Sequence, residues 1–380
     1  MKVRLGQTED GVEVSLDIKK FFKQRLLVQG ISGSWKSATV DDLMRLLKLN
    51  MTQETIKEIA DDLKLEYDIG ETDSIPQIIL DWEGERIDMY KNFGNYIVLS
   101  NTEDESNNID VENASIWGEE VRKNQSSVII DLSSFKSIDE RETIVSEFIS
   151  AIIDADREYW KPCIILIDEG HNLCKQVGKC HSKDAIIRLC ETGRKRGLAT
   201  IMVTQRLAQL NKNASAQLAN RIIGLTIELP DRESATKMLG LPVTSGGKEL
   251  SELKGGEFYV FGDALINEPV KFRVDDKTPE ELQGISTNPL DIIETLKEKS
   301  AQPEIISSLS SNQLTTLHVE LEKVSHRLED SKLVGYSEAM NVIKNRIKHN
   351  KELAGFWKKE DELQFKTQMI RGMLITDLVN

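Results

Sequence analysis

The segment Arg25–Leu49, RLLVQGISGSWKSATVDDLMRLLKL, constrains the fold of this chain more than any other stretch. It begins with apolar residues, continues through a loop that contains glycine, and ends in a run with helical spacing. Gly30, Lys36 and Ser37 match the pattern G-x-x-x-x-G-K-[ST], and Trp35 stands where the second glycine belongs. This order predicts a strand, a phosphate-binding loop and a helix.

Each residue type in this loop has a chemical reason. Backbone N–H groups at the start of a helix surround phosphates, and a lysine adds positive charge beside the β- and γ-phosphates of a nucleotide. A serine hydroxyl in the position of Ser37 is a ligand for Mg²⁺. Trp35 either narrows the pocket or points outward and covers the nucleotide. The alternative is a glycine-rich turn with no ligand. The expected ATP-binding residues are Gly30, Ser32, Gly33, Ser34, Trp35, Lys36, Ser37 and Ala38.

The second strong motif is the segment Lys161–Glu169, KPCIILIDE, an apolar run that ends in two acidic residues. This is the arrangement of a Walker B strand. Asp168 would hold Mg²⁺ through water, and Glu169 would orient or deprotonate the water that attacks the phosphate. Two acids at a strand end are also found as solvated caps. Their combination with a phosphate-binding loop favours the catalytic interpretation.

Further apolar runs predict strands that alternate with helices, and this alternation indicates a mostly parallel sheet with helices on both faces. The expected strands are Ile75–Asp81, Asn95–Ser100, Ser126–Leu132, Leu198–Thr204, Arg221–Glu228, Glu257–Asp263 and Pro269–Val274, the last at the sheet edge. The expected helices are Thr52–Leu65, Ile138–Tyr159 and Lys183–Arg196. We expect an N-terminal hairpin over 1–24, an α/β core over 25–278 and a helical C-terminal region over 279–380.

Length, composition and charge narrow the class of protein. A chain of 380 residues with 39% hydrophobic content can bury a full α/β core and carry a smaller second region. It has no apolar leader and no run of membrane-spanning length, so we expect a soluble, cytoplasmic protein. The formal net charge of -14 argues against a generally basic nucleic-acid-binding surface, although the pore of a ring can carry a different charge from its outside.

Four cysteines, Cys163, Cys174, Cys180 and Cys190, fall within one short section, and a disulfide framework is not expected in a cytoplasmic chain. His171, Cys174, Cys180 and His181 suggest zinc at first sight. Their spacing, H-x2-C-x5-C-H, matches none of the usual paired-ligand patterns. Reduced cysteines without a metal are the better interpretation.

Two more polar groups come next along the chain. Arg194, Lys195 and Arg196 stand just before the expected strand Leu198–Thr204, and Gln205 follows that strand. Basic residues at the end of a helix commonly compensate its dipole. They would also be placed to reach a phosphate in a neighbouring subunit, and the amide of Gln205 would be placed to sense the γ-phosphate.

Taken together, these motifs resemble the HerA/FtsK branch of RecA-like P-loop ATPases. The resemblance covers roughly Leu5 to Val274 and includes GISGSWKS, DWEGE, IILIDEGHNL, GRKRG and VTQRLAQLNKNASAQLANRIIGL. It implies that Arg194, with Arg196 as second candidate, reaches the nucleotide of the adjacent subunit. It also implies that Gln205 is the polar sensor, and that Lys36 and Glu169 complete the catalytic set.

Members of this branch form hexameric rings that couple ATP hydrolysis to DNA translocation, often beside a nuclease, and HerA-like rings also occur in antiviral systems with an effector enzyme. The resemblance therefore implies ATP and Mg²⁺ as cofactors, a homo-oligomer, DNA and an effector protein as partners, and no membrane. The β-barrel that precedes the P-loop in HerA is not expected, because about two dozen residues precede this P-loop strand. The alternatives are a nucleotide-gated scaffold for an effector enzyme and a relative that translocates protein or serves conjugation.

Overall fold

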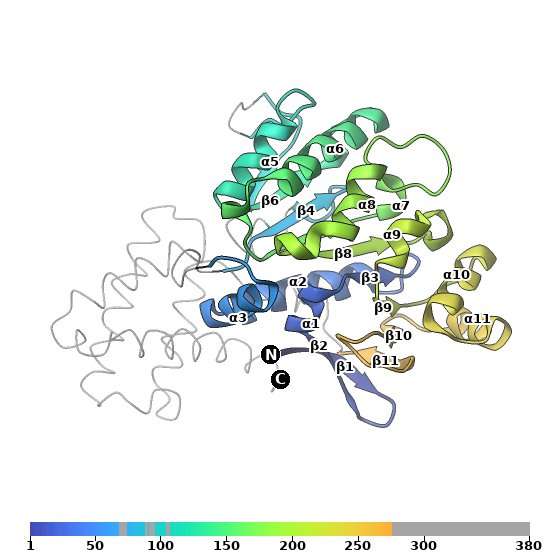
Figure 1. The fold of residues 1–380 in the computed structure, drawn as a ribbon. Helices are drawn as coiled ribbons and strands as arrows, with labels where there is room; N and C mark the ends of the chain where they lie inside the picture. The colour runs from blue at the N-terminus through green and yellow to red at the C-terminus, as the bar shows by residue number, and fades with distance from the viewer. Residues whose placement is uncertain (68–73, 88–89, 91–95, 104–106, 276–380) are drawn as a thin grey trace, which may run out of the picture. The chain divides into compact units, whose positions relative to one another are not determined.

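The computed structural model describes residues 1–67, 74–87, 90, 96–103 and 107–275. Their centre is an 11-stranded sheet with the order β2-β1-β11-β10-β9-β3-β8-β7-β4-β6-β5 (Figure 1). Neighbouring strands from β9 to β5 run parallel, and those from β9 to β2 run antiparallel. The strand of the phosphate loop, β3, is separated from the Walker B strand, β7, by β8. This mostly parallel sheet confirms the expected RecA-like α/β core. The expected helical region 279–380 lies outside the described residues.

The strands are short and mostly apolar. Their bounds are β1 Lys2–Thr8, β2 Glu13–Asp17, β3 Leu26–Gln29, β4 Gln77–Asp81, β5 Tyr96–Leu99, β6 Ser127–Asp131, β7 Cys163–Ile167, β8 Leu198–Thr204, β9 Asn220–Ile223, β10 Glu257–Phe261 and β11 Val270–Val274. The central ones, β3, β4, β7 and β8, are buried along their whole length. Strands covered on both faces read as continuous apolar runs, which is why the sequence identified them.

The helices from α2 to α9 connect the parallel strands, whereas α1 precedes β3 and both α10 and α11 lie between β9 and β10. Their bounds are α1 Ile18–Lys23, α2 Lys36–Asn50, α3 Gln53–Leu63, α5 Ala114–Lys123, α6 Ile138–Asp154, α7 Gly170–Leu173, α8 Lys183–Thr192, α9 Lys212–Ala216, α10 Leu229–Leu239 and α11 Val243–Glu252, with 3₁₀ turns η1 Leu132–Ser134, η2 Arg157–Tyr159, η3 Gly193–Arg196 and η4 Leu207–Gln209. The hydroxyl of Thr52 caps α3 by accepting a hydrogen bond from the Thr55 N–H.

The core divides between the two faces of the sheet. Alternate residues of β4, β6 and β7, among them Ile78, Val128 and Ile165, belong to one apolar cluster with residues of α6 and α8. The residues between them, such as Ile79 and Ile164, point to the other face and are also fully buried. Both faces are therefore covered, and the ends of the strands are left to carry polar chemistry.

Three element ends differ from expectation by four residues or more. Helix α6 stops at Asp154 instead of Tyr159, and α8 stops at Thr192, where the backbone tightens into the 3₁₀ turn η3. Strand β9 stops at Ile223, and the next residue, Gly224, lies so close to the ring of Phe258 that a Cβ atom there would meet it at 2.8 Å. The backbone leaves the strand there, and the Gly224 N–H donates to the carbonyl of Gln29.

The expectation that Pro269–Val274 closes the sheet edge is wrong. Strand β11 lies between β10 and β1, and β2 is the edge strand. Gly6 in β1 allows the close pairing, because a Cβ there would lie 2.0 Å from the carbonyl oxygen of Arg273. The hairpin of β1 and β2 thus extends the same sheet. In the described part of the chain, no helix has the length and apolar character needed to cross a membrane.

Candidate functional site

The phosphate loop occupies the expected place between β3 and α2. The first turn of α2 has no side-chain cap, so the N–H groups at its start are not satisfied by a capping side chain. The Ser34 hydroxyl is buried and has no hydrogen-bond partner among the described residues. Lys36 is buried, whereas Ser32, Gly33 and Ser37 are exposed. Unsatisfied donors beside a buried lysine suit an anionic ligand such as a phosphate.

Trp35 adopts the backbone conformation that glycine normally supplies at this position. Its φ of 66° and ψ of 19° lie in the left-handed region, which disfavours a side chain. Its indole lies against the turn formed by Gly255 and Gly256 and is 40% exposed. The loop therefore keeps its left-handed residue before Lys36, with an indole in place of a hydrogen atom.

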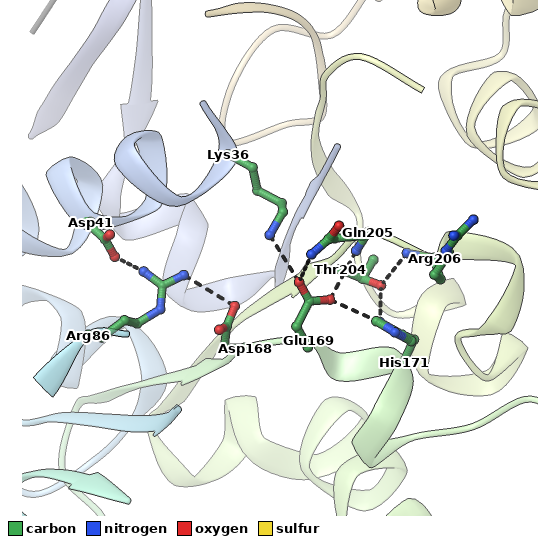
Figure 2. Close-up of polar contacts among 9 residues, drawn as sticks. All are labelled: Lys36, Asp41, Arg86, Asp168, Glu169, His171, Thr204, Gln205 and Arg206. Atoms are coloured by element: carbon green, nitrogen blue, oxygen red, sulfur yellow. Dashed lines mark hydrogen bonds and ion pairs between the residues drawn. The ribbon is translucent and has the colours of Figure 1, made fainter. Parts of the chain in front are cut away.

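Glu169 is the centre of the polar network at the ends of the strands (Figure 2). Its Oε1 lies 3.3 Å from Lys36 Nζ and accepts a hydrogen bond from Gln205 Nε2 at 2.7 Å. Its Oε2 lies 3.1 Å from Nδ1 of His171. The structure thus brings together three residues expected from the sequence, Lys36, Glu169 and Gln205, although they lie far apart along the chain.

The surroundings of Glu169 favour its charged form. Burial by itself raises the pKa of the Glu169 carboxyl, but the hydrogen bond with His171, the charge of Lys36 and the hydrogen bond from Gln205 outweigh burial and lower the pKa to about 2. Glu169 also has a left-handed backbone, with a φ of 43°. A carboxylate held ionised in a strained position at a strand end is typical of a functional group.

His171 extends this network to the segment after β8. Its Nδ1 lies 3.0 Å from the hydroxyl of Thr204, and the same hydroxyl accepts a hydrogen bond from the N–H of Arg206 at 3.1 Å. From the sequence, His171 was considered only as a zinc ligand, and Thr204 was not expected in the site. The available signal was the position of His171, two residues after Glu169 on the short helix α7.

Asp168 has a separate partner that the sequence analysis missed. Nη2 of Arg86 donates to Asp168 Oδ1 at 3.2 Å, and Nη1 of Arg86 pairs with Asp41 on α2 (Figure 2). The N–H of Arg86 donates to Asp81 Oδ2 at 2.9 Å. The pKa of Asp81 is raised to about 6, mainly by burial and also by the negative charge of Asp168, against the lowering effect of the hydrogen bond from Arg86. The signal for Arg86 was its place directly after DWEGE.

The residues present fit ATP and Mg²⁺. Asp168 would hold the metal from the end of β7 and Ser37 from the start of α2, and a hydroxyl and a carboxylate are the oxygen ligands that Mg²⁺ takes beside phosphates. The four cysteines are free thiols. Among the residues that the structure describes, no group of three or more His, Cys, Asp and Glu side chains is placed to hold a metal.

The basic turn lies at the opposite end of β8 from this network. Turn η3 ends at Arg196, just before β8 begins, whereas Gln205 follows the last residue of β8. Arg196 is engaged locally, since its guanidinium lies 5.1 Å from the ring centroid of Trp160 and its Nη1 donates to the carbonyl of Thr192. Arg194 is exposed, and its side chain makes no hydrogen bond or ion pair with another described residue, although its carbonyl accepts from the N–H of Gly197. The structure therefore does not bring Arg194 to the Glu169 network of its own chain.

The sequence of the chain is similar to proteins named as helicases. It is 28% identical over 160 residues to the protein named Probable helicase from Methanocaldococcus jannaschii, a match that covers 41% of this chain and 29% of that protein. It is 26% identical over 180 residues to DNA double-strand break repair helicase HerA from Saccharolobus solfataricus, a match that covers 45% of this chain and 35% of that protein. Over this segment the chain is similar to HerA. The match spans about a third of the length of these relatives. No protein-family model matches the chain.

Similar chains are found among solved structures. VirB4 of Thermoanaerobacter pseudethanolicus has 13% sequence identity and a TM-score of 0.47, over 74% of this chain and 98% of VirB4. A second similar structure is the genome packaging NTPase B204 from Sulfolobus turreted icosahedral virus 2, in complex with AMPPCP. It has 16% sequence identity and a TM-score of 0.41, over 66% of this chain and 98% of B204. Both TM-scores lie below 0.5.

Proposed function

We propose that the HerA-like chain is a Mg²⁺-dependent ATPase that assembles into a hexameric ring and uses ATP hydrolysis to move or remodel DNA. The observation that carries the proposal is the cluster of Lys36, Glu169 and Gln205. It joins the start of the phosphate-loop helix, the end of the Walker B strand and the end of the strand between them. Named helicases among the similar sequences support DNA as the substrate.

The geometry suggests a sequence of events at Glu169. The γ-phosphate of ATP offers Lys36 a stronger partner than Glu169, because it carries more than one negative charge. When Lys36 turns to the phosphate, the Glu169 carboxylate loses a cation and becomes more basic. It then accepts a proton from the attacking water, whose oxygen bonds to the γ-phosphorus as the bond from that phosphorus to the ADP leaving group breaks. Gln205 and His171 keep the orientation of the carboxylate. Mg²⁺, when bound, would neutralise charge on the phosphates.

Arg194 supplies the part of the site that one chain lacks. It is exposed at the end of the sheet away from the phosphate loop, so it serves the nucleotide of an adjacent subunit in a ring. Arg196, the second candidate, is bound to its own turn. An effector protein such as a nuclease, in a repair or antiviral assembly, completes the proposed set of partners.

The proposal is tested by measuring ATP turnover with and without DNA, on protein whose mass in solution is known. We expect turnover that rises with DNA and falls by roughly 100-fold or more in Glu169→Gln, because a general base contributes about that factor. Glu252→Gln, at an exposed helix end, is the matched control and should not change turnover. A ring of the expected mass that shows no turnover with any DNA would overturn the proposed activity.

One observation favours a second function, that of a scaffold which assembles an effector enzyme without turnover. Lys36 and Asp168 already have protein partners, Glu169 and Arg86, so the network is neutralised without a ligand. A scaffold would bind its effector equally well in the wild-type and Lys36→Ala forms. A motor would lose nucleotide-dependent assembly or DNA movement in the same comparison.

A further inference from the structure

Trp35 and the two glycines opposite it form a matched contact that the catalytic scheme above does not use. A Cβ atom at Gly255 would lie 3.0 Å from the indole Nε1 of Trp35, and one at Gly256 would lie 3.1 Å from its Cε3. Gly255 and Gly256 belong to the turn that leads into β10, more than 200 residues from the phosphate loop. The bulky side chain in the loop therefore fits a space that exists because two side chains are absent across from it.

Backbone contacts join the same two segments. The N–H of Gly256 donates to the carbonyl of Ser34 at 3.3 Å, and its own carbonyl accepts from the N–H of Val274 at 2.9 Å. A Cβ at Gly255 would also lie 3.1 Å from the carbonyl oxygen of Gly33. The turn before β10 thus touches three consecutive residues of the phosphate loop, Gly33, Ser34 and Trp35, just before Lys36.

We propose that Trp35 is a positioning residue, which anchors the phosphate loop on the Gly255–Gly256 turn and so holds the Lys36 end of the loop ready for the phosphates of ATP. The inference rests on the proposed function for the identity of the ligand. A loop fixed before binding does not have to be ordered by the nucleotide, and this increases affinity. Trp35 is then a working replacement for the usual glycine and not a defect.

Trp35→Gly restores the second glycine of the pattern G-x-x-x-x-G-K-[ST], and an anchoring role for Trp35 predicts that this variant binds ATP less well than the wild type. Glycine adopts the left-handed conformation of residue 35 without strain, so Trp35→Gly relieves strain and removes only the indole contact. If Trp35 obstructed the site, this variant would bind ATP more tightly. Because we infer an anchor, we expect Trp35→Gly to raise the KM for ATP by about tenfold with a smaller change in kcat.

Gly255→Ala disturbs the contact between the turn and the Trp35 indole by changing the turn instead of the indole. The backbone of Gly255 does not have a positive φ, so its Cβ adds no backbone strain and acts only through the indole and the Gly33 carbonyl. We expect Gly255→Ala to raise the KM for ATP as Trp35→Gly does. Trp35→Phe keeps an aromatic ring at residue 35, so we expect it to retain most of the ATP affinity that Trp35→Gly loses. Gly247→Ala is the control, because a Cβ there meets its nearest neighbour at 4.0 Å.

Amide hydrogen exchange in the absence of nucleotide provides the second measurement, which does not depend on ATPase activity. We expect faster exchange over 30–36 and 254–257 in Trp35→Gly and Gly255→Ala, but not in Gly247→Ala. If the wild-type protein neither binds nor hydrolyses ATP, the proposed function is refuted. The exchange rates would still show whether Trp35 anchors the phosphate loop on the Gly255–Gly256 turn. Unchanged exchange together with a lower KM in Trp35→Gly would overturn the anchor.

Discussion

The two ends of strand β8 carry polar residues of opposite character. At its C-terminal end, Glu169 and Lys36 are nearly buried, with side chains 6% exposed, and Gln205 completes their hydrogen bonding. At its N-terminal end, Arg194 is exposed and its guanidinium has no hydrogen-bond or ion-pair partner among the described residues. The seven residues of β8 separate the two ends by roughly 20 Å, which is beyond the reach of an arginine side chain. One chain therefore presents most of a site at one end and a complementary cation at the other.

The largest effect that we expect follows from this separation. Arg194→Ala should lower kcat for ATP by about 10³-fold, the lower end of the range for an arginine supplied by a neighbouring molecule, and should leave ATP affinity unchanged. Lys195→Ala, at the exposed neighbouring position, is the control. Turnover and nucleotide binding are measured on the same assembled protein.

Mixed assemblies test whether Arg194 acts across an interface. Rings made from Arg194→Ala chains and Glu169→Gln chains contain some interfaces at which an intact Arg194 faces an intact Glu169. Part of the turnover should return on mixing, although each variant alone is inactive. If turnover does not recover in rings shown to contain both chains, Arg194 does not act on the nucleotide of the adjacent subunit.

A smaller effect is expected from the residue that holds the basic turn in place. Arg122, at the end of α5, is 2% exposed and donates from Nη1 to the carbonyl of Lys161 and from Nη2 to the carbonyl of Arg196. Burial lowers its pKa to about 10. Arg122→Met leaves these carbonyls without their donors and should lower the free energy of unfolding by about 2–3 kcal/mol.

For a domain of this size that loss corresponds to a Tm decrease of roughly 5–10 °C, measured by calorimetry. Lys123→Ala, at the exposed next position, should leave the Tm unchanged. Because Arg122 holds η3, turnover should fall in Arg122→Met at temperatures well below its Tm, while ATP binding is retained. Normal turnover in a destabilised Arg122→Met protein would show that the position of η3 is not important for catalysis.

The central strands and the two nucleotide motifs could be predicted from the sequence, because strands covered on both faces give unbroken apolar runs. Strand β8 has the predicted bounds, Leu198–Thr204. Helix α1, Ile18–Lys23, was not predicted, since six residues carry too little periodicity. Helices α10 and α11 were also missed; α10 shows little separation of polar and apolar faces, and α11 contains Gly246 and Gly247.

The partners of the site residues could not be predicted in the same way. Arg86 and Asp168 lie 82 residues apart, and His171 and Thr204 lie 33 apart. Only the strand order brings β4, β7 and β8 together, and no local pattern encodes that order. The contact of Trp35 with Gly255 and Gly256 could not be predicted for the same reason, because it depends on the turn before β10 lying beside the phosphate loop.

The smallest expected effect distinguishes two acids within the polar end of the sheet. The folded-state pKa of Asp81, about 6, lies above the ordinary value of 3.8, so the native state binds more protons than the unfolded state between these values. Its contribution to stability is therefore present at low pH and is lost as the pH rises through about 6. Glu169 has the opposite shift, and its contribution is lost only as the pH falls from 4.5 toward about 2.

Above about pH 4.5 the two acids can therefore be separated. Asp81→Asn keeps an oxygen that accepts from one of the two N–H groups and removes the titration. Between about pH 4 and pH 7, the stability of the wild type relative to Asp81→Asn should fall by about 2 kcal/mol, measured by urea denaturation. Asp10→Asn, in an exposed turn, is the control. A difference that does not change with pH would mean that Asp81 is ionised at all these values, and that the contrast between these two acids is absent in solution.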